Sequence, residues 1–533
     1  MAGVESLEGT AHTSPPGRPA AAWASRLRRP RLDRFDIGLL GLLVALSAWT
    51  LGLDLWQVVV HGRIWTGTEA VYQEDGMQSM MWIEGILHHG ASPDLYVLVH
   101  TPADFFQPLL GISAGVAALG VAPYVALLLW KPVAIVAIFF AVRAYVHRTV
   151  SGLWPRRAAL TLALFFGWGA VIGDSWIVFW SWGYPFALIA LACAIGALLA
   201  YARDRAAGRV GLLPALLGAL ASWLHPWQGE TLLVILLGTE LVLLARRERV
   251  AMAALALTVA LTALPLGYFA ALVHFDAVWQ REREAALSTY PVWLVVKAFV
   301  LLVIPAALAY RVRAVSFLAV TARVWPFAVV AVFALSEWQG SGSTHALLGA
   351  TVPLGVLAVE GVRTLPWHAL AQRLPRPTVS LPALAVVAIA VLTIPGTIYM
   401  FKYAYRAVRP RQGNANFIAP GESAALSYLA HDPQPGGVLT RFYLGVIVPA
   451  QTGRQTYTGN CYWSEPYCRY RSVMAEELLA GKLSATRARS FVQSTGARFV
   501  LGDCRATNLT AALQPIASAV YRFRCATVYV IRR

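Results

Sequence analysis

The chain has 533 residues, of which 58% are hydrophobic and 13% are charged, and its mean hydropathy is +0.57. Because a soluble domain carries about 25% charged residues, this composition excludes a protein surrounded mainly by water and indicates a polytopic membrane protein. The formal net charge of +17 does not indicate nucleic-acid binding. The arginines stand in short clusters between apolar runs, where such clusters set membrane orientation.

The N-terminal segment is rich in Pro, Ala and Arg, which predicts a disordered cytoplasmic tail over residues 1–35. An apolar run follows at 36–56. It is too long for the core of a signal peptide, and no clear A-x-A site comes after it, so we expect an uncleaved first span.

An acidic segment follows the first span and predicts a first outer loop over residues 57–122. Its part up to residue 105 holds six acidic residues and one arginine, a balance expected outside the membrane. The apolar piece at 106–121 could be a short span or a re-entrant or interfacial helix. The charge pattern favours a helix that does not span.

Further apolar runs bring the expected number of spans to about eleven. Arginine clusters alternate with acidic or mixed loops between them, so the clusters fall on one predicted side of the membrane. This topology predicts a transmembrane domain over residues 36–401, a cytoplasmic N-terminus and an extracytoplasmic C-terminal segment. The further runs lie near 123–142, 157–173, 184–202, 210–225, 229–245, 250–273, 292–310, 324–337, 345–361 and 381–401.

Residues 402–533 break into short strand-like and helical runs, which predict a small external α/β domain. Its composition has fewer long apolar runs than the preceding region. The strands are expected at 437–440, 454–458, 497–501 and 526–531, and the helices at 421–431, 470–482 and 485–495.

Four cysteines of this segment, Cys461, Cys468, Cys504 and Cys525, predict two disulfides in an oxidising compartment. Three pairings are open, and short local loops favour Cys461 with Cys468 and Cys504 with Cys525. A zinc site is the weaker alternative, because the segment has no CxxC motif and no histidine close in sequence to the cysteines.

The first candidates for chemistry are the adjacent acids Glu74 and Asp75, in the stretch 71–90, VYQEDGMQSMMWIEGILHHG. They precede an amphipathic helical pattern at the expected membrane surface. A carboxylate there could act as general base toward a hydroxyl group or as a ligand of a divalent cation. The alternative interpretation is a solvated pair of loop acids.

The order of these features resembles the GT-C superfamily of membrane glycosyltransferases: one leading span, an acidic outer loop with a Glu-Asp pair, many further spans and an external α/β domain. The stretch 452–459, TGRQTYTG, with Trp463, Arg471 and the stretch 496–501, GARFVL, is similar to the external domain of many bacterial GT-C-like proteins. The resemblance implies a sugar donor on a polyprenyl phosphate and a site made by the outer loops. It also implies Asp75 or Glu74 as the catalytic base, without deciding between them.

Polar side chains at the predicted outer ends of the spans are candidates for substrate binding, because exposing them to lipid would cost several kcal/mol each. The tryptophan could equally be an interfacial anchor. These candidates are His225, Trp227, Gln228, Glu230, Glu337 and His345.

Three more outer residues are candidates. Arg281 and Arg283 suit a lipid phosphate, although they could also pair with neighbouring glutamates or touch lipid headgroups. Asp174 could be a second acid, which leaves a divalent cation open as a cofactor.

No phosphate loop, GxGxxG, HExxH or GxSxG motif supports a nucleotide-driven pump, a Rossmann oxidoreductase, a zincin or an α/β-hydrolase. We therefore expect an inverting hexosyl- or pentosyltransferase of a bacterial plasma membrane. It would move a sugar from a polyprenyl-phosphate donor to an envelope glycan, lipid or protein acceptor on the outer face. A lipid or glycan transporter and a non-enzymatic envelope assembly factor are the alternatives.

Overall fold

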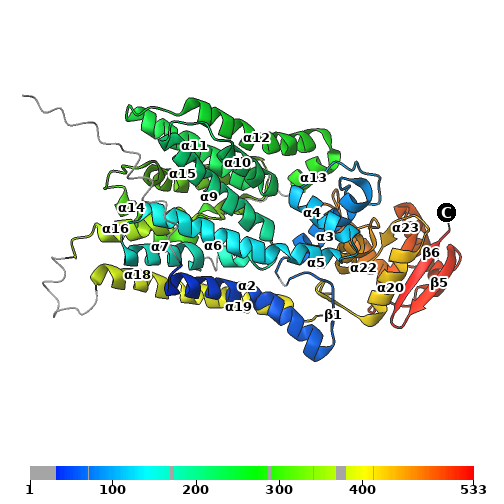
Figure 1. The fold of residues 1–533 in the computed structure, drawn as a ribbon. Helices are drawn as coiled ribbons and strands as arrows, with labels where there is room; N and C mark the ends of the chain where they lie inside the picture. Colours follow the sequence, from blue (N-terminus) through cyan, green and yellow to red (C-terminus); the bar gives the residue numbers. More distant parts are fainter. Residues whose placement is uncertain are drawn as a thin grey trace, which may run out of the picture.

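The computed structural model describes residues 32–69, 71–167, 173–285, 290–339, 341–367, 380–411 and 413–532. Nearly all of the predicted N-terminal tail therefore lies outside the described residues. A long helical bundle occupies most of the molecule, and a small domain with a mixed sheet lies at one end of it (Figure 1).

Eight segments of the described chain are long and apolar enough to cross a membrane. Every run predicted to span lies on a helix, but three of these helices have only 13 residues, which gives a length of about 20 Å against an apolar core of about 30 Å. The eight segments are α2 (Arg34–His61), α5 with α6 (Pro123–Leu128 and Trp130–Thr149), α9 (Pro185–Ala206), α11 (Pro226–Ala245), α12 (Met252–Phe275), α14 (Val292–Ala309), α15 (Phe317–Gln339) and α18 with α19 (Leu381–Leu392 and Ile394–Val408); the three short helices are α7 (Leu153–Phe165), α10 (Leu212–Leu224) and α16 (Thr351–Arg363).

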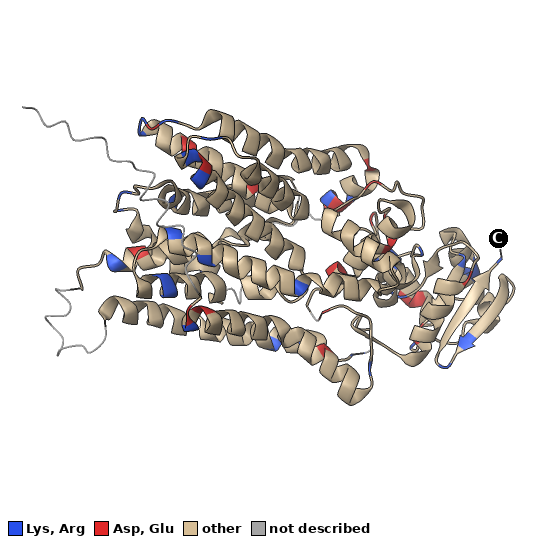
Figure 2. Ribbon diagram, in the orientation of Figure 1, with Lys and Arg blue, Asp and Glu red and all other residues tan. Residues whose placement is uncertain are grey.

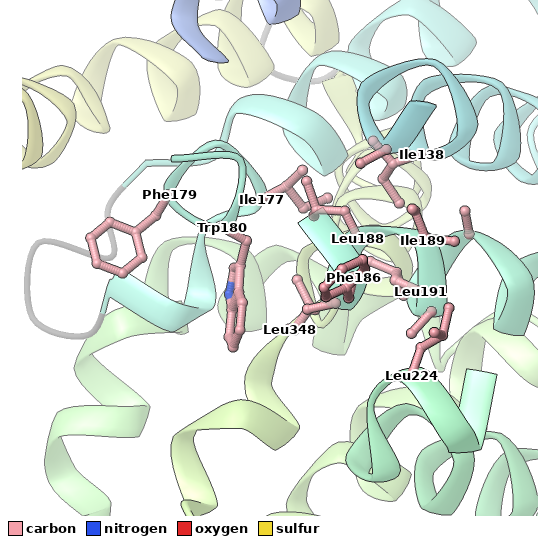
Figure 3. Packing of buried hydrophobic residues seen from close by; sticks show 14 of the residues in the cluster. Ile138, Ile177, Phe179, Trp180, Phe186, Leu188, Ile189, Leu191, Leu224 and Leu348 are labelled. Atoms are coloured by element: carbon pink, nitrogen blue, oxygen red, sulfur yellow. The ribbon is translucent and has the colours of Figure 1, made fainter. Parts of the chain in front are cut away.

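Aliphatic and aromatic side chains hold the bundle together. Figure 3 shows Ile138 of α6, Leu188 of α9 and Leu224 of α10 in one buried cluster with Trp180 of the short helix α8 (Ile177–Trp180). Because the α8–α9 segment lies inside this cluster, the residues that precede and follow α8 are held in fixed positions at the end of the bundle.

Buried ion pairs join helices at the other end of the bundle. Helix α2 begins with a capping box in which Asp33 and Asp36 each accept a backbone N–H. The Asp36 carboxylate also accepts a hydrogen bond from Arg143 Nη2 of α6 at 2.7 Å, and both side chains are buried. Figure 2 shows many lysines and arginines at this end, opposite the C-terminal sheet.

The first outer loop contains a strand, β1 (Ile64–Trp65), and two helices, α3 (Gln73–His89) and α4 (Pro108–Ala118). Helix α4 covers most of the apolar piece whose nature the sequence left open. With 11 residues it is about 16 Å long, too short to cross a membrane. It packs against α3, so this piece belongs to the outer loop.

The C-terminal domain has a four-stranded sheet in the order β3-β4-β6-β5, in which β3 and β4 are parallel and the other neighbours antiparallel. Residues 454–458, predicted as a strand, form only an isolated bridge from Thr456 to Val438. The strand β5 and the helix α21 have no counterpart in the prediction. The elements are β2 (Phe417–Ile418), α20 (Pro420–His431), β3 (Val438–Leu439), α21 (Phe442–Thr452), α22 (Cys468–Leu479), α23 (Ala485–Thr495), β4 (Phe499–Gly502), α24 (Thr510–Leu513), β5 (Ala517–Phe523) and β6 (Ala526–Ile531).

Disulfides join Cys461 to Cys468 and Cys504 to Cys525, the pairing that short loops favour. All four thiols are therefore used, which removes the zinc alternative. The fifth cysteine, Cys193, is free.

The first outer loop and the C-terminal domain are packed into one body. β1 pairs antiparallel with β2. Farther along the loop, Thr456 N donates to Leu95 O at 2.8 Å, and the Tyr96 hydroxyl donates to Val446 O at 3.3 Å. This packing fixes α3 between the bundle and the C-terminal sheet.

Candidate active site

Glu74 and Asp75 lie in the first turn of α3, where the partial positive charge of a helix N-terminus favours a carboxylate. The Glu74 side chain is exposed, whereas Asp75 is half-buried. Burial first, and then the charges of Glu74 and Asp174, raise the pKa of Asp75 to about 7. A carboxyl group with this pKa exchanges protons near neutral pH, as a general base does.

Asp174 comes from the 3-10 helix η3 (Gly173–Ser175), which lies against a second 3-10 helix, η4 (Ser343–Leu347). The Thr344 hydroxyl of η4 donates to Asp174 Oδ2 at 2.5 Å, and Trp180 Nε1 donates to the Asp174 backbone oxygen at 2.7 Å. These bonds hold the Asp174 carboxylate near enough to α3 for its charge to act on Asp75. The acids of two predicted outer turns thus share one site.

His225 and His345 form a second polar group beside these acids. His225 Nε2 and His345 Nδ1 are 3.1 Å apart, and the two ring planes differ by 5°. Burial lowers the pKa of both imidazoles, although the charge of Asp174 acts in the opposite direction on His345. Both rings are therefore neutral at pH 7, so one nitrogen of the pair donates and the other accepts.

Aromatic rings surround the histidine pair. The Trp227 ring centroid lies 4.5 Å from that of His345, and the Trp180 centroid lies 4.9 Å from it on another side. Tyr72, which directly precedes α3, contacts both Trp180 and Tyr184. This aromatic wall connects the carboxyl groups of α3 with the two imidazoles.

Other predicted residues take positions around this centre. Gln228 Nε2 donates to Leu348 O at 3.1 Å, so this side-chain amide is engaged in a contact within the protein. Glu230 Oε2 is buried and has no hydrogen-bond partner among the described residues. Glu337 accepts hydrogen bonds from the Ser343 hydroxyl and from the Tyr290 backbone N–H, so it links α15 to η4 and to the start of α14.

The two arginines of α13 (Ala277–Ala285) point to different places. Arg283 is exposed, and its Nε donates to Gln339 O at 2.6 Å, close in sequence to Glu337. Arg281 Nε donates to Ala277 O within its own helix, and the guanidinium acts electrostatically on Asp94 of the first outer loop. The structure therefore places Arg283 at the rim of the candidate site and Arg281 toward a separate cavity.

Three residues near the acids were not predicted as site residues. Burial and then the charge of Asp75 raise the pKa of Tyr184 and of Tyr462, and the charge of Glu282 acts on both tyrosines in the same direction. Burial raises the pKa of Glu282 itself to about 7. Tyr462 comes from the loop closed by Cys461 and Cys468, so the C-terminal domain also reaches the site. Only the folded chain brings these three residues together, because they are far apart in sequence.

The residues available do not fit a metal centre. Among the described residues, no group of three or more His, Cys, Asp or Glu side chains is arranged to hold a metal ion. Lys131 of α6 is paired with a carboxylate: its Nζ lies 2.6 Å and 2.5 Å from the two carboxylate oxygens of Glu69. We therefore derive no step through a divalent cation.

Comparison with known proteins gives a fold but no sequence relative. No protein-family model matches the chain, and no curated protein is similar to it in sequence. The apo oligosaccharyltransferase of Archaeoglobus fulgidus is similar in structure, with a TM-score of 0.52, 11% identity, and coverage of 91% of this chain and 73% of that chain.

Two further structures are similar. AglB from Archaeoglobus fulgidus, in complex with an inhibitory peptide and a dolichol-phosphate, has a TM-score of 0.53 and 12% identity over 94% of this chain and 74% of that chain. ArnT from Cupriavidus metallidurans, bound to undecaprenyl phosphate, has a TM-score of 0.48 and 14% identity over 92% and 98% of the two chains. The likeness to the oligosaccharyltransferase establishes that the chain has a GT-C-type fold.

Proposed function

We propose that this chain is a membrane glycosyltransferase that moves a sugar from a polyprenyl-phosphate donor to a hydroxyl or other nucleophilic group of an envelope glycan, lipid or protein. The observation that carries the proposal is the meeting of Glu74, Asp75 and Asp174 beside a neutral histidine pair, in a chain with a GT-C-type fold. The dolichol-phosphate in one oligosaccharyltransferase structure supports a lipid-linked donor.

Asp75 is the proposed general base. Because its pKa is about 7, a substantial fraction of Asp75 is ionised at neutral pH, and this carboxylate can accept a proton. It takes the proton of the acceptor hydroxyl while the acceptor oxygen bonds to the anomeric carbon of the sugar. The bond from that carbon to the phosphate oxygen breaks, its electron pair leaves with the polyprenyl phosphate, and the configuration inverts.

The remaining groups are proposed to hold the donor and the acceptor. The neutral pair of His225 and His345 can donate to or accept from sugar hydroxyls, and the Trp227 ring beside them offers an apolar face to a pyranose or furanose. The exposed Arg283 is suited to the donor phosphate, because a guanidinium donates a planar pair of N–H groups to phosphate oxygens. Glu337 and Glu230 line the same end of the bundle.

The proposed location is a bacterial plasma membrane, with the N-terminus in the cytoplasm and the C-terminal domain outside. Many of the lysines and arginines lie at the bundle end opposite the C-terminal sheet, which supports this orientation under the positive-inside rule (Figure 2). The two disulfides support an oxidising compartment for the C-terminal domain.

Sugar transfer by the purified full chain from a panel of radiolabelled polyprenyl-phosphate monosaccharides, with envelope extracts as acceptor, tests the proposal. We expect Asp75→Asn to lower the transfer rate by about 10²–10⁴-fold, the range by which general bases accelerate reactions. Glu74→Gln should lower it less, since the Glu74 side chain is exposed.

Glu84→Gln is the matched control, because Glu84 lies on the same helix and its partner is His88, outside the candidate site. It should retain wild-type transfer. Wild-type transfer by the Glu74→Gln, Asp75→Asn double variant would refute the assignment of the base, and movement of the lipid across vesicles without any transfer would favour a transporter.

A further inference from the structure

A cavity apart from the candidate active site lies where α3, the end of α12 and the Cys461–Cys468 loop meet. Its wall contains three tryptophans, Trp82, Trp279 and Trp463, and three aspartates, Asp94, Asp104 and Asp276. These six residues come from the first outer loop, from the α12–α13 segment and from the C-terminal domain. The cavity exists only because the three regions pack together.

The three indole rings pack edge to face against one another in the wall of this cavity. The Trp463 ring centroid lies 4.8 Å from that of Trp279 and 5.8 Å from that of Trp82, and its plane stands at 86° to both. Trp463 is only 7% exposed. Such rings present negative faces, which attract cations.

The carboxyl groups in the wall of this cavity form no ion pair among the described residues. Asp94 is 7% exposed; its Oδ1 accepts from Tyr96 N at 2.8 Å, while its Oδ2 is buried without a hydrogen-bond partner among the described residues. Asp276 Oδ1 accepts from Val278 N at 2.8 Å. No lysine or arginine lines the cavity, and none of its three aspartates takes part in an ion pair of the described residues.

The electrostatics confirm that the acids are crowded. Burial and the charge of Asp276 raise the pKa of Asp94 to about 7, although the charges of Arg281 and Arg471 act in the opposite direction. Burial and the neighbouring Asp276 raise the pKa of Asp104 to about 6. A ligand that brings positive charge would relieve this repulsion, whereas a neutral hydroxyl would only supply a donor.

We propose that this cavity binds an organic ammonium group, with the aspartates as hydrogen-bond acceptors and the indole rings as the cation-binding wall. An ammonium has three N–H donors, which suits three carboxyl groups and the free Oδ2 of Asp94. A metal ion suits the cavity less, because the described carboxyl groups are not arranged as a metal site. The source of the ammonium is either an amino sugar or an ethanolamine headgroup.

The position of the cavity relates it to the proposed reaction. Trp82 lies seven residues after Asp75 on the same helix, which is about 10 Å along the axis. This relation rests on the proposed function: if Asp75 is the base, the ammonium belongs to a part of the acceptor away from the reacting hydroxyl. Binding itself requires no turnover, so it can be tested separately.

Isothermal titration calorimetry of the full chain in lipid nanodiscs tests the site, with glucosamine and phosphoethanolamine as ammonium probes and glucose as the neutral probe matched in shape. We expect glucosamine or phosphoethanolamine to bind at least about tenfold more tightly than glucose, a difference of about 1.4 kcal/mol. Whichever of the two binds more tightly identifies the source of the ammonium.

Asp94→Asn and Asp276→Asn, which preserve side-chain shape, should each weaken binding of the preferred ammonium probe about tenfold or more. Asp75→Asn is the control and should bind as the wild type does, even where it abolishes transfer. Three results would each overturn the proposal. The first is equal binding of glucose and glucosamine, and the second is no heat with any probe. The third is undiminished binding in both aspartate variants, provided that these variants unfold as the wild type does.

Discussion

Two opposing effects act on the carboxyl group of Asp75. Its place in the first turn of α3 favours the ionised form, whereas burial and the charges of Glu74 and Asp174 favour the protonated form. The second set is stronger, and the pKa rises to about 7. The neighbouring residues, more than the aspartate itself, therefore decide whether this group can serve as a base at neutral pH.

The pH dependence of transfer should follow this pKa. A general base acts in its deprotonated form, so kcat/KM is expected to rise as pH increases through about 7 and to level off above it. Glu74→Gln removes a like charge, which lowers the pKa of Asp75 and should move the rise to lower pH. Initial rates between about pH 5 and pH 9 measure both effects; a flat wild-type profile, or a shift to higher pH in the variant, would contradict the assignment.

At the scale of helices, several charged residues inside the bundle are bonded to partners on other helices. Asp36 of α2 is bonded to Arg143 of α6, and Glu240 of α11 accepts hydrogen bonds from both Tyr201 and Arg205 of α9. A charge inside a bundle is costly without a partner. Each of these contacts therefore constrains which helices can lie side by side.

Arg143→Leu should destabilise the protein, because it leaves the buried Asp36 carboxylate without its ion-pair partner. Breaking a buried pair in this way costs about 3–5 kcal/mol, so thermal unfolding in detergent should occur at a clearly lower temperature. Arg148→Leu is the matched control, since Arg148 lies exposed on the same helix and bonds to Ala144 O within that helix. Equal melting temperatures of the two variants would show that the pair contributes little.

At the scale of the whole molecule, the first outer loop is the element that joins the bundle to the C-terminal domain. α21 packs against α3 and places its backbone against the segment 456–459. A Cβ atom at Gly445 of α21 would lie 1.8 Å from Thr458 O, and one at Gly459 would lie 2.5 Å from the Tyr96 ring. This close approach positions Tyr462 near Asp75 and Trp463 near Trp82.

Gly445→Ala should therefore destabilise the C-terminal domain where α21 meets the segment 456–459, because the neighbouring atom, Thr458 O, belongs to a backbone carbonyl that cannot turn aside. Overpacking of this kind costs about 1–3 kcal/mol, measurable as a lower melting temperature. Gly115→Ala in α4 has open space around the added methyl and should be neutral or gain about 0.5–1 kcal/mol as a helix substitution. A Gly445→Ala protein as stable as Gly115→Ala would show that α21 and the segment 456–459 are not tightly packed against each other.

The positions of individual elements follow largely from local sequence. Hydropathy and arginine clusters predict a helix at each of the spans, and the helix at 485–495 and the strand at 526–531 have the predicted bounds. The same holds for the pairing of Cys504 with Cys525 within one short loop. These features depend on residues close together in the chain, so composition and periodicity are sufficient.

Tertiary structure decided the rest. β5, whose side chains are half exposed, forms a strand because β6 offers it an edge, and the run 442–452 is a buried helix although its apolar sequence would also suit a strand. The meeting of Asp75 with Asp174, and of Asp94 with Asp276, joins residues far apart in the chain. Sequence alone determined that this is a many-span membrane protein with an acidic loop after its first span. Only packing, which sets burial and the distances between charges, determined which acids are shifted in pKa and which cavities they line.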